Sequence, residues 1–213
     1  MCIRDRLMPI PIEEISKFPL PGLDVPSGFS FSPDGKYLAY LKSADTSGYK
    51  ALYGLDLVNR SEFVIADNLG DSSSKETLEE QLRKQRLRQM SGGISQYFWT
   101  KDSNILIPYQ GNIYWLDDPF SAPELLMPAS DHPCLDVKAS PNGRFISFVR
   151  NGDIHLIEIK SRASFKLTEG ECDSTRGLAD YIAQEEMARS TGYWWSPDSY
   201  YVAFTEVTEK HVP

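Results

Sequence analysis

The sequence of 213 residues contains few cysteines and histidines, the residues that disulfide frameworks and many metal sites need. It has three cysteines, an odd number, and no Cys-x-x-Cys pair, so neither a zinc ribbon nor a thioredoxin-type motif is indicated. The three histidines, His132, His155 and His211, are scattered without the spacing of metal ligands on a helix. His155 lies in the middle of an expected strand, where it is interpreted as a packing or surface residue. We therefore expect no metal ion and no cofactor.

Long hydrophobic runs and an excess of positive charge are missing too. No apolar run approaches the roughly 18 residues of a membrane helix, and the first fifteen residues lack the apolar core of a signal peptide. The formal net charge is -8, which argues against a nucleic-acid footprint. We expect a soluble chain with no membrane segment and no nucleic-acid partner, in either the cytoplasm or the periplasm.

A nucleophile elbow is also absent, because no Gly-x-Ser-x-Gly occurs in the sequence. The nearest segment, Ala188 to Gly192, lacks the first glycine, and no aspartate and histidine follow it in a suitable context. A Ser-His-Asp triad cannot be assembled from this chain, so no residue of it is predicted to be catalytic.

What the sequence does contain is a repeated turn followed by a strand. Each copy opens with Ser or Thr, then Asp or Asn two residues later and Gly or Ser after that, and an alternating aromatic and aliphatic strand follows. Pro favours the second position of a type I turn, Asp or Asn tolerates the tight geometry, and Gly relieves it. The four copies begin at Ser32, Thr100, Ser140 and Ser196.

The spacing of these turns predicts the fold. A second strand follows each of the first three copies, at residues 52–57, 112–117 and 153–159, so each unit has antiparallel strands of period two. The turns begin 68, 40 and 56 residues apart, and a propeller blade takes about 40 to 45 residues and four strands. The sequence therefore predicts an all-β fold, a partial β-propeller of four-stranded antiparallel blades with two short helical inserts. The alternative is a β-sandwich with a chance similarity between turns.

The first insert follows the first blade, at about residues 71–93. Ser73 and Glu76 match a capping box, and acidic residues early and basic residues late complement a helix dipole. We expect a helix over residues 75–90. A basic helix end is usually a solvated face; the functional alternative is an arm that presents an arginine to an anionic or carbonyl group.

The second insert, at about residues 169–190, is expected to be a short polar helix. Asp180 is the expected N-cap. Leu178, Ile182 and Met187 are expected to anchor one side of the helix.

Two adjacent carboxylates, Glu185 and Glu186, lie in this second helix. Neighbouring residues are about 100° apart on a helix, so the pair does not share one stripe. Near a helix end they can still converge on one small cation through charge-assisted hydrogen bonds. An exposed acidic pair with no ligand is the alternative.

The segment from Ala183 to Asp198, Ala-Gln-Glu-Glu-Met-Ala-Arg-Ser-Thr-Gly-Tyr-Trp-Trp-Ser-Pro-Asp, resembles the glutamate-motif segment of the dipeptidyl peptidase IV family of prolyl oligopeptidase-type serine peptidases. It is most similar to bacterial members and to the dipeptidyl peptidase 8 and 9 branch. The similarity extends upstream through Glu79-Glu80 and the stretch from Gly93 to Tyr97, and it covers most of residues 26–213.

The resemblance implies an eight-bladed propeller that caps a C-terminal α/β-hydrolase domain. Such enzymes remove Xaa-Pro or Xaa-Ala dipeptides from peptides with a free N-terminus. By matching position, Glu185 and Glu186 would bind the substrate ammonium as a buried pair. Arg86 or Arg88 would contact the substrate carbonyl region, and the resemblance does not choose between them.

The resemblance also implies partners and boundaries. The expected partners are peptide substrates, the protein's own hydrolase domain and, for the full-length protein, a second copy in a homodimer. Residues 26–213 are expected to form an incomplete propeller, with residues 1–25 as an N-terminal segment in which Met1 to Leu7 fit no blade and are interpreted as a truncation or sequence-assembly scar. We expect a fragment of a longer serine dipeptidyl peptidase, inactive alone. The alternatives are a catalytically silent propeller used as an interaction scaffold, and an unrelated propeller of the WD or kelch type.

Overall fold

The computed structural model describes residues 11–17, 25–43, 48–70, 92–129, 132–171, 173–208 and 210. Apart from two short helices, α1 (Ile12–Ile15) and α3 (Tyr181–Glu185), the regular elements in these ranges are strands. The strands of the three largest sheets are β1 (Ser27–Phe31), β2 (Tyr37–Ser43), β3 (Lys50–Asp56), β4 (Ser61–Ala66), β5 (Phe98–Trp99), β6 (Ile105–Tyr109), β7 (Asn112–Leu116), β8 (Glu124–Met127), β9 (Leu135–Ala139), β10 (Phe145–Arg150), β11 (Asp153–Glu158) and β12 (Ser164–Lys166).

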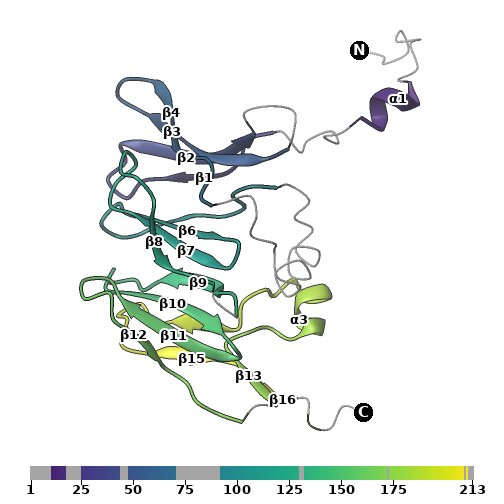
Figure 1. The fold of residues 1–213 in the computed structure, drawn as a ribbon, viewed down its shortest axis with the longest axis vertical. Helices are drawn as coiled ribbons and strands as arrows, with labels where there is room; N and C mark the ends of the chain where they lie inside the picture. Colours follow the sequence, from purple (N-terminus) through teal and green to yellow (C-terminus); the bar gives the residue numbers. More distant parts are fainter. Residues whose placement is uncertain are drawn as a thin grey trace.

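These twelve strands form three antiparallel meanders, ordered β1-β2-β3-β4, β5-β6-β7-β8 and β12-β11-β10-β9. A fourth unit begins with the hairpin of β14 (Tyr193–Trp195) and β15 (Val202–Phe204). Figure 1 shows the sheets stacked one upon the next, from β1–β4 at the top to β15 near the bottom. Face-to-face stacking of four-stranded meanders is the blade arrangement of a propeller, and the predicted all-β fold class is confirmed. The predicted second strands correspond to β3, β7 and β11.

In three of the repeated turns, a serine hydroxyl bonds the side-chain oxygen of an Asp or Asn. Ser32 Oγ donates to Asp34 Oδ1 at 2.6 Å and accepts the backbone N–H of Tyr37 at 3.0 Å. The same pair of bonds recurs in the turns that begin at Ser140 and Ser196. The side chain therefore closes the loop that separates the first two strands of a blade, as the sequence pattern predicts.

Buried apolar side chains of the alternating strands fill the spaces between neighbouring sheets. Leu52 and Ile107 are completely buried between the first and second sheets, and Ile146 lies in the next core, between the second and third. Tyr193 of β14 is completely buried against Val149 of β10 and other side chains of the third sheet. Each fully buried large side chain contributes about 1.5 to 3 kcal/mol. The third sheet is thus the base on which β14, the strand after α3, is held.

The first insert lies outside the described residues, and with it the expected helix over residues 75–90, Arg86 and Arg88. The residues that follow it are described. Gly92 C=O accepts the N–H of Lys50 at 3.0 Å, and the N–H of Ile94 donates to Lys50 C=O at 2.8 Å. Gly93 forms an isolated parallel bridge with Lys50, so the chain rejoins the fold at the start of β3.

Two classes of feature are absent from the described ranges. No helix there is long and apolar enough to cross a membrane. The same ranges contain no group of three or more His, Cys, Asp or Glu side chains that could hold a metal ion.

Candidate functional site

Helix α3 begins where the sequence predicts a cap. The Asp180 side chain accepts the backbone N–H of Ala183 at 2.9 Å, which confirms Asp180 as the N-cap. At the other end, Glu186 is the C-cap, and the N–H of Arg189 donates to Ala183 C=O at 2.9 Å. Ala188 has a φ of 50°, so the chain leaves the helix through the left-handed region.

The expected apolar anchors of this helix are partly wrong. Leu178 is half-buried and packs against the core that contains Tyr193. Ile182 and Met187, however, are 59% and 69% exposed. The helix has only five residues, too few for an apolar stripe, and Ala183 is its one buried residue. Capping and the flanking segments therefore hold α3 in place, rather than an apolar face.

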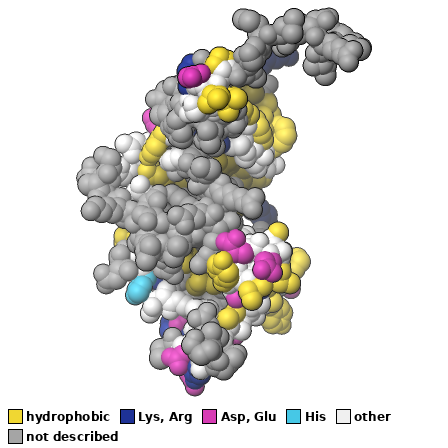
Figure 2. All heavy atoms as spheres, turned by 90° about the vertical axis from the view of Figure 1, so that its right-hand side faces the viewer, with side chains coloured by type: hydrophobic (Ala, Val, Ile, Leu, Met, Phe, Trp, Pro, Cys, Tyr) yellow, Lys and Arg dark blue, Asp and Glu magenta, His cyan; other side chains and the backbone are white. Residues whose placement is uncertain are grey.

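Glu185 and Glu186 lie at the last helical position and the C-cap, and both side chains are exposed. The expectation of a buried pair is therefore wrong for this structure, because α3 projects from one side of the stacked sheets (Figure 1). Figure 2, drawn from that side, shows acidic side chains next to hydrophobic ones on this face. Within the described part of the chain neither glutamate side chain forms a hydrogen bond or ion pair, whereas the Asp180 side chain caps the helix and pairs with Arg189. Among the described residues no side chain occupies either of these two carboxylates.

Backbone hydrogen bonds to Thr205 join the two segments that flank α3 to the rest of the fold. The Thr205 N–H donates to Gly192 C=O at 2.8 Å, and the Gly177 N–H donates to Thr205 C=O at 3.0 Å. A Cβ on Gly192 would lie 2.4 Å from the backbone carbonyl carbon of Leu178, so only glycine lets the segments before and after α3 approach this closely. Through Gly177 and Gly192, both segments are bonded to the same residue, Thr205.

Next to these bonds, β13 (Ser174–Arg176) and β16 (Glu206–Thr208) form a short antiparallel pair, and a buried ion pair links β13 to β11. Arg176 Nε contacts Asp153 Oδ1 at 2.6 Å, and Arg176 also pairs with Glu206 at 3.1 Å. Burial acts to raise the pKa of Asp153, but hydrogen bonds from Arg176, Lys166 and Thr168 outweigh it, and the net pKa is lowered. The carboxylate is therefore ionised and joins β11 to β13.

The surroundings of His155 and Cys134 show how each side chain is held. His155 stacks on Phe148 at 5.5 Å between ring centroids, and burial lowers the pKa of its imidazole, which supports the packing interpretation. Burial raises the pKa of the Cys134 thiol to about 11, so this thiol is not an activated nucleophile.

Sequence reasoning missed the residues that support α3. Lys138 on β9 contacts Thr191 and Tyr193, and Arg189 contacts Asp180. Thr191 and Tyr193 are more than fifty residues away from Lys138 in sequence, with no local pattern to link them. For Arg189 the nine-residue separation from Asp180, across the helix, was the available signal.

Comparison with known proteins identifies a family. The family model described as dipeptidyl peptidase IV (DPP IV) N-terminal region matches residues 95–213, which include α3 and both glutamates. A protein of Schizosaccharomyces pombe described as a dipeptidyl aminopeptidase is 36% identical over 75 residues, 35% of this chain and 10% of that protein. Dipeptidyl-aminopeptidase B of Aspergillus niger is 33% identical over 76 residues, 35% of this chain and 8% of that protein.

A solved structure supports the fold. The crystal structure of Porphyromonas gingivalis dipeptidyl peptidase 4 matches with a TM-score of 0.58 and 18% identity, over 87% of this chain and 26% of that one. The curated relatives are much longer than the matched segments, which span about a tenth of their length. Because the family model matches more than half of the sequence, the chain belongs to the dipeptidyl peptidase IV N-terminal region family.

Proposed function

We propose that this chain is the substrate-recognition propeller portion of a serine dipeptidyl peptidase, which releases N-terminal Xaa-Pro or Xaa-Ala dipeptides. The observation that carries the proposal is the family match over residues 95–213, which contains the glutamate pair. Relatives that match this chain are named as dipeptidyl aminopeptidases. The hydrolytic chemistry would come from a hydrolase domain that residues 1–213 do not include.

In this proposal Glu185 and Glu186 bind the terminal ammonium of the peptide. Two carboxylates around one ammonium form charge-assisted hydrogen bonds, which are about twice as strong as neutral ones. Both side chains are exposed, so a ligand can reach them without opening the fold. No cation within the described residues competes for either carboxylate.

The same pair would make the enzyme an exopeptidase. A peptide that enters with an internal segment would cover two hydrated carboxylates without offering a positive charge, and unpaired desolvated acids are costly. A peptide with a free amine offers an ammonium group that pairs with both carboxylates. The ammonium then sets where the chain begins, and the scissile bond lies two residues further on, so the gain is one of orientation.

An arginine from the first insert would complete the recognition site. We propose that Arg86 or Arg88 contacts the substrate carbonyl region. Both precede Gly92 and Gly93 in sequence, and these two glycines lie beside Lys50 at the start of β3. Alanine variants of the two arginines, compared in the full-length enzyme, will show which one weakens the use of peptide substrates.

Neutralising the pair tests the proposal. In the full-length enzyme Glu185→Gln and Glu186→Gln should each lower kcat/KM for Gly-Pro-p-nitroanilide by roughly tenfold to a hundredfold, because hydrogen bonds to charged groups are worth about 1.5 to 3 kcal/mol. Glu124→Gln is the matched control, since Glu124 is an exposed glutamate on β8 that pairs with Arg162.

A second readout separates lost recognition from lost folding. An organophosphonate without an amine should label the active-site serine of both variants at the wild-type rate, because the serine belongs to another domain. Wild-type kinetics in both glutamine variants would remove the pair from the site. A full-length wild-type protein with no turnover and no labelling would favour the interaction scaffold instead.

A further inference from the structure

Strand β9 contains a strained bulge on the side that faces the α3 insert. Ser147 of β10 pairs with Lys138, but Val149 pairs with Leu135, so β9 has one residue more than its partner over this stretch. Asp136 lies in the bulge with a φ of 48°. A non-glycine residue in this region costs about 1 to 2 kcal/mol, and bulges are frequent next to functional sites, where they redirect a side chain. Such strain persists only where surrounding contacts enforce it.

The bulge directs Asp136 and Lys138 to the segment that follows α3. Lys138 Nζ donates to Tyr193 C=O at 2.6 Å, lies 3.7 Å above the centre of the Tyr193 ring and hydrogen-bonds Thr191 Oγ1. Asp136 Oδ2 pairs with Lys138 at 3.1 Å and accepts the Thr191 hydroxyl at 2.7 Å. The Tyr193 hydroxyl donates to Asp136 C=O at 2.6 Å. Lys138 and Asp136 therefore form a clamp on the stretch from Thr191 to Tyr193.

Polar contacts continue from this clamp to the helix. Thr191 C=O accepts from Arg189 at 3.2 Å, and the same guanidinium lies 3.4 Å from Asp180 Oδ2. Asp180 is the N-cap of α3, and the Arg189 N–H bonds Ala183 C=O within the helix. A continuous path of hydrogen bonds and ion pairs thus runs from β9 to the N-cap of α3 and to Ala183 in its middle.

We infer that Lys138, held by Asp136, is a positioning residue for the glutamate pair. The inference rests on the proposed function of Glu185 and Glu186 and adds the residue that fixes their place. Helix α3 is short and keeps only Ala183 buried, so its orientation depends on its flanks. The Lys138 charge is compensated by Asp136, so it acts through geometry rather than as a second charge at the site. A displacement of about 1 Å in a positioning group can cost as much as a hundredfold in rate.

A double-mutant cycle in the full-length enzyme tests the positioning role of Lys138. Lys138→Met keeps the length of the side chain and removes its donors. It should lower kcat/KM for Gly-Pro-p-nitroanilide by roughly tenfold, mainly through KM, in the wild-type background. In the Glu185→Gln/Glu186→Gln background the same change should cost less than about twofold, because sites that act as a unit are not additive.

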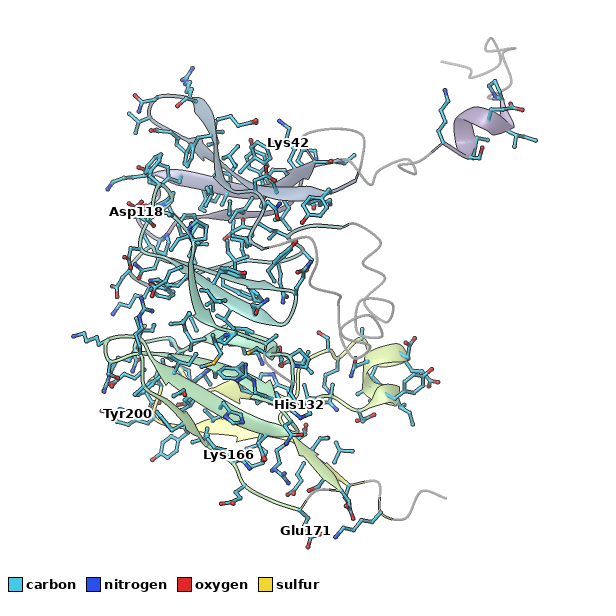
Figure 3. All side chains as sticks on the ribbon, viewed as in Figure 1. Lys42, Asp118, His132, Lys166, Glu171 and Tyr200 are labelled. Atoms are coloured by element: carbon cyan, nitrogen blue, oxygen red, sulfur yellow. The ribbon has the colours of Figure 1, made fainter. Side chains whose placement is uncertain are left out.

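Lys42→Met is the matched control. Lys42 also pairs with an acid, Glu62 at 2.9 Å, and lies 5.1 Å from the centre of the Tyr53 ring. It belongs to the first sheet, far from α3 (Figure 3). This variant should keep wild-type kcat/KM in both backgrounds.

The outcomes distinguish failure of the positioning role from failure of the proposed function. If the glutamine variants lose activity and Lys138→Met costs the same factor in both backgrounds, or costs nothing, the positioning role is wrong while the amine anchor stands. If the glutamine variants keep wild-type kinetics, the proposed function itself fails. Should Lys138→Met not fold, Thr191→Val removes one partner of the clamp, and the same non-additivity is required of it; additive behaviour would overturn the inference.

Discussion

At the scale of single residues, the repeated turn shows where local strain is tolerated. Its fourth residue lies in the left-handed region in all four copies, and that residue is Gly35 or Gly143 in two of them but Ser103 (φ 63°) or Ser199 (φ 64°) in the others. Ser199 gains a compensating bond, because its Oγ accepts the N–H of Asn142 at 3.0 Å. Ser103 has no side-chain hydrogen bond within the described residues. Its backbone strain is therefore uncompensated.

Replacing Ser103 by Gly should stabilise the propeller. The left-handed conformation costs an L-residue about 1 to 2 kcal/mol, which glycine avoids. Glycine also raises the entropy of the unfolded chain, which offsets about 0.4 to 1 kcal/mol of that gain in stability. We expect the unfolding temperature of the full-length protein to rise in Ser103→Gly and to fall in the converse control, Gly35→Ser. Equal melting temperatures for the two variants in a thermal scan would contradict this account of the turn.

At the scale of elements, much of the architecture was predictable and its long-range contacts were not. The alternation of apolar residues predicted the strands that became β3, β7 and β11, and Asp180 predicted the start of α3. The pairing of β13 with β16 could not be predicted, since three-residue polar strands show no period and their partners lie about thirty residues apart. The Lys138 clamp could not be predicted either, because Thr191 and Tyr193 lie more than fifty residues away from Lys138 in sequence. The apolar anchors Ile182 and Met187 were wrong because α3 ends after five residues.

The buried ion pair between β11 and β13 gives these elements an acid-sensitive link. Arg176 holds the pKa of Asp153 below its usual value despite burial. Because the folded-state pKa is lowered, the contribution of Asp153 to stability is fully present above its unfolded pKa, about 3.9, and is lost as the pH falls through the lower folded pKa.

We expect Asp153→Asn to reduce the loss of stability on acidification below about pH 4, as measured by urea unfolding across the pH range. Arg176→Met removes the buried partner of Asp153 and leaves the carboxylate with Lys166 and Thr168. It should destabilise the fold near neutral pH by less than the about 3 to 5 kcal/mol that an unpaired buried charge costs. A wild-type acid dependence in Asp153→Asn would show that this carboxylate is not the linked group.

At the scale of the whole molecule, the two end sheets expose apolar surface. Phe29 and Phe31 of β1 are more than half exposed, and Tyr200 and Tyr201 beside β15 are 83% and 73% exposed (Figure 3). An open cavity of about 370 Å³ lies at that lower end, lined by aromatic side chains from β10, β14, β15 and the turn between the last two. In a closed propeller every blade face is covered by a neighbour, and exposed apolar patches and unpaired strand edges promote association.

The 213-residue chain expressed alone should therefore self-associate. Light scattering after size-exclusion chromatography at micromolar concentration should show species larger than one chain, and the variant Tyr200→Ser/Tyr201→Ser should shift them towards the monomer. A monodisperse monomer with a sharp cooperative melt would contradict this expectation.

Recognition of a terminal ammonium by Glu185 and Glu186 can be tested by changing the substrate and the protein together. We would measure kcat/KM in the full-length enzyme for Gly-Pro-p-nitroanilide and for its analogue with a hydroxyl in place of the amine. The wild-type enzyme should prefer the amine, and that preference should fall by roughly tenfold to a hundredfold in Glu185→Gln/Glu186→Gln, because only the charged substrate loses its partners. An unchanged ratio of the two kcat/KM values in the variant would show that the ammonium is bound elsewhere.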